Sequence, residues 1–343
     1  MSQALETLFN DLKDAPRLLI EAELRPVQGE RFQPTGFPDL GAATYKAPKT
    51  DKNGNVEYVP MLLVESAQSM ANRLEEVCWD KAENRIVDEL SGLPHLVIDV
   101  AGSQTSTIQE AHRLNSPYLM SFNDDLKATI KKAVGDPDKG SLDIRKLAQI
   151  VFKHDVGSVL HGVFLEKVAG RLRLQRLLSG FIEARGVLPV TSGGVKLDHV
   201  NPSGNAKDGY GNVPFTRTEY TAASITAYFN LDLATMRGYG LGEAADRLLI
   251  ALSLYKIQSL LQGGMKLRTA CDFDVADLKV TRPENTTLTG ISLATLKASL
   301  PELIKACAFE ASSFKPVSIT EDQLSKTRKK KDDATDAQPA SDE

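Results

Sequence analysis

Residues 17–41 read RLLIEAELRPVQGERFQPTGFPDLG and contain the first predicted strand followed by an irregular loop. Between Arg17 and Arg25, apolar residues alternate with others, which predicts a half-buried strand. Three glycines and three prolines between Arg25 and Gly41 exclude a regular helix or a central strand. The same loop contains arginine, glutamine and phenylalanine, which can hold a phosphate backbone and stack on unpaired bases. An irregular surface loop with a small hydrophobic tuck is the competing interpretation.

The composition is that of an ordinary globular protein. At 343 residues the chain allows one elaborated domain or two, with 42% hydrophobic and 25% charged residues. No apolar run approaches the roughly 20 residues that span a bilayer, and the N-terminal sequence does not indicate a signal peptide. We therefore expect a cytoplasmic protein without membrane contact. Cys78, Cys271 and Cys307 are widely spaced, which predicts buried reduced thiols.

The charge is unevenly distributed along the chain. A net charge of -4 argues against a protein that coats duplex DNA non-specifically. Residues 145–185 nevertheless contain eight lysines or arginines against three acidic residues. Residues 326–343 combine a basic block with acidic residues and lack apolar side chains for a core, which predicts a disordered tail. A polybasic arm that binds nucleic acid is the alternative for this tail.

The pattern of residues predicts an α+β fold. Helices are expected at 64–79, 109–114, 124–134 and 243–262, and strands at 17–25, 96–100, 157–165, 170–185, 219–233 and 266–275. Residues 186–216 are rich in glycine, proline, asparagine and serine, which indicates an extended hairpin. The predicted core order is strand, helix, strand, a long insertion, strand, helix, strand. That order is typical of ferredoxin-like and RNA-recognition-motif folds.

Two local motifs raise the question of an enzyme. Residues 238–242 read GYGLG before a helix, but the spacing matches neither a dinucleotide loop nor a Walker loop. A flexible helix N-terminus is the favoured interpretation. His154, Asp155 and His161 are compatible with acid–base or metal chemistry, yet no metal-ligand spacing accompanies them. We expect His154 to form a hydrogen bond or contact RNA, and Asp99, at the end of a strand, to be structural.

Two further stretches place hydrogen-bond donors together. Arg171, Arg173 and Gln175 share one face of a predicted strand, which is either a solvated face or a basic track. Gly263 and Gly264 end the predicted helix at 243–262 as a C-cap, and a glycine pair also allows close approach of a ligand. Lysine, arginine and glutamine donors flank this pair.

Three stretches together are similar to a known family: residues 17–41, residues 64–74 (VESAQSMANRL) and residues 263–268 (GGMKLR). They resemble the repeated backbone subunit, of the RAMP superfamily, in type I-G CRISPR surveillance complexes, the Cascade assemblies. The resemblance covers roughly residues 15–276. It implies an RNA-recognition-motif palm with a helical finger insertion and a β-hairpin thumb.

The resemblance also implies a function. Such subunits polymerise along a CRISPR RNA as a helical filament, contact other Cascade subunits, and present the guide for pairing with a target DNA strand. The protein then needs phosphate contacts and permissive glycines, because base pairing reads the sequence. We expect no catalytic residue, no metal and no cofactor. The expected domains are a palm at 15–102 and 151–280 with the thumb at about 186–216, a finger at 103–150, a C-terminal extension at 281–325 and the tail.

The candidate RNA-binding residues come from the matched motifs and from charge placement. The resemblance implies contacts by Gln28, Arg31, Gln33, Ser69, Asn72, Arg73, Gly263, Gly264 and Arg268. Charge placement and neighbouring donors or rings add Phe32, Lys153, His154, Arg171, Arg173, Arg217, Gln262 and Lys266. The aromatic motifs of ordinary RNA-recognition domains are absent, so we expect binding through phosphates rather than base stacking on the sheet.

Two enzymatic alternatives remain open at this stage. The first is a metal-dependent RNA-processing endoribonuclease of the RAMP class that uses Asp99, His154 and Asp155. The second is a small-molecule enzyme that uses the loop at residues 238–242.

Overall fold

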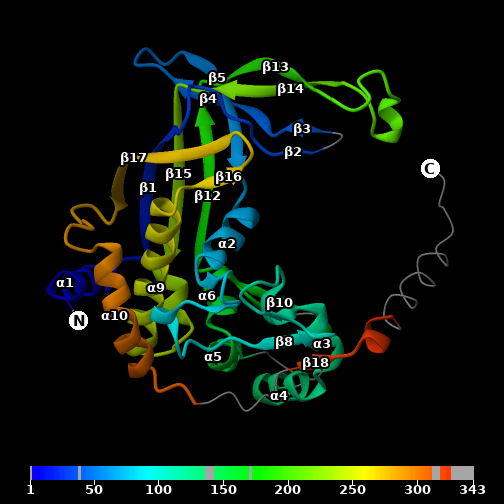
Figure 1. The fold of residues 1–343 in the computed structure, drawn as a ribbon. Coiled ribbons are helices and arrows are strands. Elements are labelled where there is room, and N and C mark those ends of the chain that lie inside the picture. Colours follow the sequence, from blue (N-terminus) through cyan, green and yellow to red (C-terminus); the bar gives the residue numbers. More distant parts are fainter. Residues whose placement is uncertain (1, 38–39, 136–142, 170–171, 311–316, 326–343) are drawn as a thin grey trace, which may run out of the picture.

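The computed structural model describes residues 2–37, 40–135, 143–169, 172–310 and 317–325, and its centre is an antiparallel sheet (Figure 1). The strands lie in the order β16-β17-β1-β15-β12-β5-β4. Their bounds are β1 (Arg17–Pro26), β4 (Thr44–Thr50), β5 (Val56–Glu65), β12 (Leu178–Arg185), β15 (Ser224–Asp232), β16 (Lys266–Arg268) and β17 (Cys271–Arg282). Together with the helices, this sheet confirms the predicted mixed α and β fold.

Two helices, α2 and α9, pack against one face of the sheet, and α3, α4, α5 and α7 form a separate group beside it. Their bounds are α1 (Gln3–Leu12), α2 (Ala67–Glu76), α3 (Pro117–Phe122), α4 (Asp124–Val134), α5 (Ile144–His154), α6 (Val156–His161), α7 (Glu166–Ala169), α8 (Leu233–Gly238), α9 (Glu243–Gln262) and α10 (Leu293–Ala306). The helix α9 has the predicted bounds. It is buried on most sides because the sheet packs on one side and α10 on another. No helix in the described part of the chain is long and apolar enough to cross a membrane.

The strand β1 lies inside the sheet, with a strand on each side. It pairs antiparallel with β15 on one side and with β17 on the other. Leu18, Ile20 and Leu24 are buried on one face because successive side chains of a strand point to opposite faces. The predicted strand at 17–25 is confirmed.

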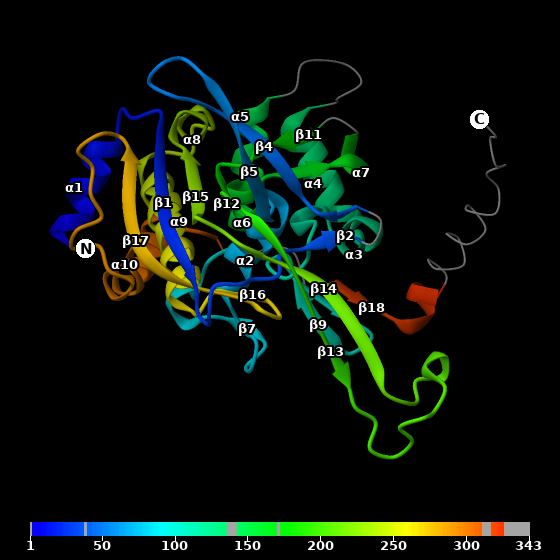
Figure 2. The ribbon, with the colours of Figure 1, turned by 90° about the horizontal axis from the view of Figure 1, so that it is seen from above.

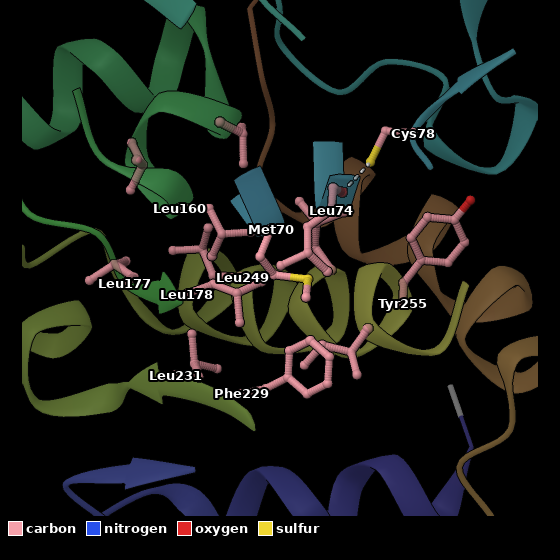
Figure 3. Packing of buried hydrophobic residues seen from close by; sticks show 14 of the residues in the cluster. Met70, Leu74, Cys78, Leu160, Leu177, Leu178, Phe229, Leu231, Leu249 and Tyr255 are labelled. Carbon is pink, nitrogen blue, oxygen red and sulfur yellow. Dashed lines mark hydrogen bonds between the residues drawn. The ribbon is translucent and has the colours of Figure 1, made fainter. Parts of the chain in front are cut away.

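The hydrophobic core lies between this sheet and the helices α2 and α9 (Figure 3). Met70 and Leu74 of α2 and Leu249 of α9 pack near Phe229 of β15. A Cβ atom at Gly180 of β12 would come within 2.8 Å of the Phe229 ring. The residue at this position must therefore be a glycine for α2 and β15 to approach so closely.

The predicted second strand of the core was wrong. Residues Val97–Val100 form β8, which pairs with β9 (Ser103–Ser106) and β18 (Val317–Ile319) in a small separate sheet. The strand β12 occupies the position beside β15 instead, with which it is in register along its whole length. The core order is therefore β1, α2, β12, β15, α9, β17. A four-residue apolar run predicts a strand but does not indicate which sheet it joins.

Two other local predictions also need correction. Residues 157–165 begin in α6, because Val156, Val159 and Leu160 are buried at helical spacing. Residues 109–114 form no α-helix; a 3-10 turn covers only Arg113–Asn115, with Arg113 at a φ of 52°. The predicted helix at 124–134 is confirmed as α4.

Short strands complete the described structure. They are β2 (Gly36–Phe37), β3 (Gly41–Ala42), β6 (Trp79–Asp80), β7 (Arg85–Ile86), β10 (Val163–Leu165) and β11 (Leu172–Leu174). The strand predicted at 266–275 is divided into β16 and β17 by a turn at Ala270, whose φ is 57°. The three cysteines are free thiols, with Cys78 and Cys271 buried and Cys307 partly exposed. The predicted tail lies outside the described residues.

A long hairpin projects from the body of the molecule (Figures 1 and 2). It consists of β13 (Leu188–Lys196) and β14 (Val213–Thr221), which pair antiparallel over their full length. A Cβ atom at Gly193 would lie 2.5 Å from the Phe215 carbonyl oxygen, so glycine is required for this pairing. The extended hairpin predicted at 186–216 is confirmed, and its paired strands continue to Thr221.

A buried polar cluster connects α2 and α9 to Arg113 and to His161 of α6. Glu75 and Arg113 form a bidentate ion pair, with 2.6 Å between Nε and Oε1 and 2.7 Å between the terminal nitrogen and Oε2. Lys256 Nζ lies 2.9 Å from His161 Nε2, and both side chains are buried. Burial, followed by the nearby cations, holds the pKa of His161 well below its usual value. The imidazole is therefore neutral in the folded protein.

We expect stability to fall as the pH drops below about 6.5, because the unfolded chain then gains a proton that folded His161 does not bind. The stability contributed by His161 is complete above that pH, and lowering the pH from 6.5 to 5.5 should remove about 1 kcal/mol of it. His154, whose pKa burial also lowers, acts in the same direction. Urea unfolding at three pH values measures how the free energy of unfolding changes with pH.

The matched variants are His161→Gln and His112→Gln, since His112 is exposed. The first should flatten the pH dependence and the second should leave it unchanged. Comparing the pH dependence of the unfolding free energy in these variants separates the contribution of His161 from those of Glu75 and Asp155. Burial raises the pKa values of these two acids. An unchanged slope in His161→Gln would contradict the assignment.

Candidate nucleic-acid interface

Glu65 is the last residue of β5 and gathers three predicted site residues around one buried carboxylate. It faces the helix side of the sheet beside Ile182. Arg73 of α2 donates from Nε to Oε1 at 2.6 Å, and the hydroxyl of Ser69 donates to the same oxygen. Arg268 of β16 donates to Oε2. Segments about 200 residues apart are therefore joined at one side chain.

The backbone oxygens of neighbouring strands complete these arginine contacts. Arg73 also donates to the Leu267 carbonyl oxygen at 2.6 Å, and Arg268 donates to the Val64 carbonyl oxygen at 3.2 Å. Each guanidinium thus connects a carboxylate with a backbone acceptor. The orientation of both side chains is fixed by two independent contacts.

Glu219 of β14 forms a second centre of the same kind at the base of the hairpin. Arg217 donates to its Oε1 at 2.7 Å, and a terminal nitrogen of Arg31 lies 3.2 Å from Oε2. Arg217 also donates to the side-chain oxygen of Gln33 at 3.3 Å. The loop after β1 and the hairpin are therefore connected through Arg217 and Glu219.

The loop after β1 joins the two centres into one continuous surface. The Gln33 backbone N–H donates to the Ala270 carbonyl oxygen at 2.7 Å, in the turn that follows Arg268. We define the arginine band as the side chains that these contacts link, namely Arg31, Gln33, Ser69, Arg73, Arg217 and Arg268. The structure thus brings together residues of the first loop, the first helix, the hairpin and the late strand, as the sequence predicted.

The band presents positive charge outward. Its four guanidinium groups face two carboxylates, which leaves an excess of two positive charges. The Glu65 and Glu219 side chains are 0% and 4% exposed, whereas that of Arg31 is 55% exposed. A guanidinium carries five N–H donors, so the contacts described leave donors available to an anion. The buried acids thus hold one exposed arginine, Arg31, and three partly exposed ones, and their free donors form a surface suited to phosphates.

The late glycine pair ends α9 and leads into β16. A Cβ atom at Gly263 would lie 2.8 Å from the Ser259 carbonyl oxygen, and Gly264 has a φ of 72° with open space beside it. Both glycines are thus required by the helix C-cap. Lys266, two residues later, is exposed. Gln262 and Gly263 also line a shallow hollow beside Glu89 and Tyr255.

Phe32 has a different role from the one that its aromatic ring indicated. Its side chain is 1% exposed and packs edge-on against Phe273, with 5.6 Å between the ring centroids. Its backbone pairs with Tyr220 in both directions at 2.9 Å. The ring is therefore not available to stack on a base. It anchors the loop so that Arg31 and Gln33, on either side, lie at the band.

The remaining predicted residues lie elsewhere or are exposed singly. Lys153 and His154 are at the end of α5, in the helical part of the molecule, whereas β16 lies at its other end (Figure 1). Arg173 of β11 lies over the Phe164 ring, 5.0 Å from its centroid. Gln28 and Asn72 are exposed. Arg171 lies outside the described residues.

The residues of the enzymatic alternatives have structural partners. The Asp99 carboxylate accepts the Gly102 N–H at 2.8 Å, and the buried Asp155 carboxylate accepts the Ser158 hydroxyl at 2.6 Å. Burial raises the pKa of Asp155. Across the described ranges, no group of three or more His, Cys, Asp or Glu residues could hold a metal ion. At the loop of residues 238–242, Gly242 is the N-cap of α9 at a φ of 95°.

The two carboxylates at the centre of the band were missed by the sequence analysis. A usable signal existed for Glu219, because Arg217 and Glu219 are two apart in a strand and therefore share a face. No local signal exists for Glu65, whose partner Arg268 is 203 residues away.

The comparisons with known proteins concern both the sequence and the fold. The family model described as CRISPR-associated protein GSU0053 matches residues 18–189. Among solved structures, a chain of "CRISPR RNA-guided surveillance complex, pre-nicking" is similar at 14% identity and a TM-score of 0.41, covering 95% of this chain and 89% of that one. The search of curated proteins found no match.

Replacing Glu65 by glutamine should destabilise the protein by about 3 kcal/mol, because two partly buried guanidinium groups lose their carboxylate. The matched control is Glu57→Gln on the same strand β5. Glu57 forms an exposed ion pair with Lys49, so its replacement should change stability by less than about 0.5 kcal/mol. Urea unfolding compares the two variants, and equal stability would show that the Glu65 centre does not hold the surface together.

Proposed function

The chain belongs to the family of CRISPR-associated protein GSU0053, and on that premise we propose that it is a subunit of a CRISPR surveillance complex that binds the guide RNA. The observation that carries this proposal is the arginine band. Arginines from four distant segments meet on one surface, held by Glu65 and Glu219. A run of solvated surface charges would not bring arginines from four segments onto two shared buried carboxylates.

The chemistry of the band suits a sugar–phosphate backbone. Guanidinium groups bind phosphate oxygens in a planar, bidentate manner. Their fixed orientation lowers the entropy that binding would otherwise cost. Where base pairing supplies the sequence specificity, the protein needs no base-reading pocket beside these ion pairs. The band therefore acts on the backbone of a single strand and leaves its bases free to pair with a target DNA strand.

The fold supports a more detailed assignment within the same proposal. The order β1, α2, β12, β15, α9, β17 with the sheet order β17-β1-β15-β12 corresponds to a ferredoxin-like palm of the RNA-recognition-motif type. The helices α3, α4 and α5 form the finger, and the hairpin β13–β14 forms the thumb. Copies of the chain polymerise along the guide RNA as a helical filament in the cytoplasm and contact the other subunits of the complex.

Neutralising Arg31 of the band together with Lys266, two residues before Arg268, should weaken binding of single-stranded RNA about tenfold and flatten its salt dependence. The variant is Arg31→Gln with Lys266→Gln, chosen because both side chains are exposed and their replacement leaves Glu65 paired. The slope of log K against log salt should fall by about 0.7 for each phosphate that the variant no longer neutralises. Fluorescence anisotropy at several salt concentrations measures both quantities.

The control removes the same charge elsewhere. Lys49→Gln with Arg85→Gln neutralises two exposed cations on β4 and β7 that pair only with surface acids. It should leave affinity and slope near those of the unaltered protein. Equal effects of the two double variants would mean that RNA affinity depends on net charge alone. The band would then not be the binding surface.

We also propose that the subunit binds RNA without cleaving it. Asp155 is buried beneath Ser158, and Asp99 holds a turn, so neither carboxylate is placed for attack on a phosphodiester. Labelled repeat RNA incubated with the purified protein and Mg²⁺ or Mn²⁺ should remain intact. Metal-dependent cleavage that Asp155→Asn abolishes would instead favour the endoribonuclease.

A further inference from the structure

The face of the main sheet opposite α2 and α9 carries a row of side chains in register. Asn230 of β15 pairs with Leu19 of β1 on one side and with Ser179 of β12 on the other. These residues alternate with buried neighbours such as Phe229 and therefore point away from the helices. Each is only partly buried. The row is accessible from the open side of the sheet.

Two aromatic rings stand in the next row of the same face. Tyr228 of β15 and Phe181 of β12 are register partners, and their rings stack at 5.1 Å between centroids with 29° between planes. Both occupy the central strands of the sheet. RNA-recognition domains stack bases on aromatic residues of their sheet face. The sequence did not indicate this pair, because its members are 47 positions apart and match no aromatic motif.

A hollow of about 250 Å³ lies over these two rows. Its lining includes Leu19, Ser179, Phe181, Tyr228 and Asn230. The volume is just below the roughly 300–1,000 Å³ of pockets for drug-sized ligands. The hollow therefore suits one planar ring system rather than a large cofactor.

The hollow offers a polar group for such a ring to recognise. The Oδ1 atom of Asn230 is enclosed and has no hydrogen-bond partner among the described residues. An enclosed amide oxygen without a partner is costly, and turning the Asn230 side chain toward the hollow would let this oxygen accept from an N–H donor of a ligand. The edges of nucleobases supply N–H donors, and asparagine is a usual reader of such edges.

The charges around the hollow allow a phosphate at its rim. Arg17 lines the hollow, and Arg282 of β17 is the register partner of Leu19. Glu21 also lines the hollow, and its carboxylate forms an ion pair with Lys279 at 3.4 Å. The site thus combines aromatic rings, an unpartnered amide and an arginine within a small volume, which together match a nucleotide.

We propose that this open face binds one nucleotide, with its base against Phe181 and Tyr228, its edge at Asn230 and its phosphate near Arg17. The site is distinct from the arginine band, which lies on the helix side. The inference deepens the proposed function, since it assigns the protein a second contact with single-stranded RNA. The same chemistry also fits a free nucleotide, so the experiment must separate the two sources.

The test measures binding of adenosine monophosphate, inorganic phosphate and a short single-stranded RNA to the full chain by saturation-transfer NMR and fluorescence anisotropy. Adenosine monophosphate should bind and inorganic phosphate should not displace it. Tyr228→Leu should weaken its binding about tenfold, the usual effect of losing one stacking ring. Asn230→Leu, which removes the amide at a similar side-chain size, should weaken it to a similar extent. The control is Tyr58→Leu, an exposed tyrosine of β5 outside the hollow.

The outcomes separate this site from the band. Arg31→Gln with Lys266→Gln should keep nucleotide binding while losing RNA affinity, so the two proposals can fail independently. If the RNA contacts this face, 4-thiouridine in the RNA should cross-link to the peptide that contains Tyr228. Binding of the mononucleotide without that cross-link assigns the site to a free nucleotide.

Three results would overturn the proposal. The first is equal affinity for adenosine monophosphate in Tyr228→Leu, Asn230→Leu and the unaltered chain. The second is displacement of the nucleotide by phosphate, which would leave the base without a role. The third is a change in sedimentation of the Tyr228→Leu variant without a change in nucleotide binding, because the face would then be a contact between protein copies.

Discussion

The structure depends on two buried carboxylates, each of which fixes two arginines. Burying a carboxylate costs several kcal/mol unless it is paired and hydrogen-bonded. Glu65 meets this requirement with Arg73, Arg268 and the Ser69 hydroxyl. Because these partners belong to α2 and β16, the charge can be satisfied only when the first helix and the late strand are both in place. The electrostatic requirement thereby becomes a requirement on the tertiary structure.

The same constraint explains how an irregular loop can serve as part of a binding surface. Glycine and proline prevent the segment after β1 from forming its own ladder of hydrogen bonds. Its position comes instead from Phe32, which enters the core, and from Gln33, which bonds to Ala270. The loop is thus held by elements that are already rigid. Arg31 consequently needs little further ordering to contact a ligand.

Local sequence patterns predicted the elements whose own residues show which side chains are buried. The alternation in β1, the apolar faces of α4 and α9, and the turn-rich hairpin were all predictable for that reason. The prediction for residues 96–100 gave the right element in the wrong sheet, and the prediction of a strand at 157–165 was wrong. A short apolar run does not indicate which elements it will pack against. The members of the band could be proposed from residue type. Glu219 could have been proposed as well, because Arg217 lies two residues before it on the same strand face. Glu65 could not, because nothing local encodes its contact with Arg268, 203 residues away.

Because successive side chains of a strand point to opposite faces, each central strand of this sheet contributes side chains both to the core and to the open face. In β15, Phe229 packs under α9, while Tyr228 and Asn230 on either side of it point to the open face. Substitutions at the open-face positions therefore leave the core contacts in place. The helix side carries the arginine band and the open side carries the aromatic pair, so the two surfaces are separated by the thickness of one sheet. A single strand of RNA that touched both would have to pass around an edge of the sheet, and β4 and β16 are the strands at those edges. Arg268 of the band lies on β16, at one of these edges, whereas Arg17 and Arg282 lie in β1 and β17.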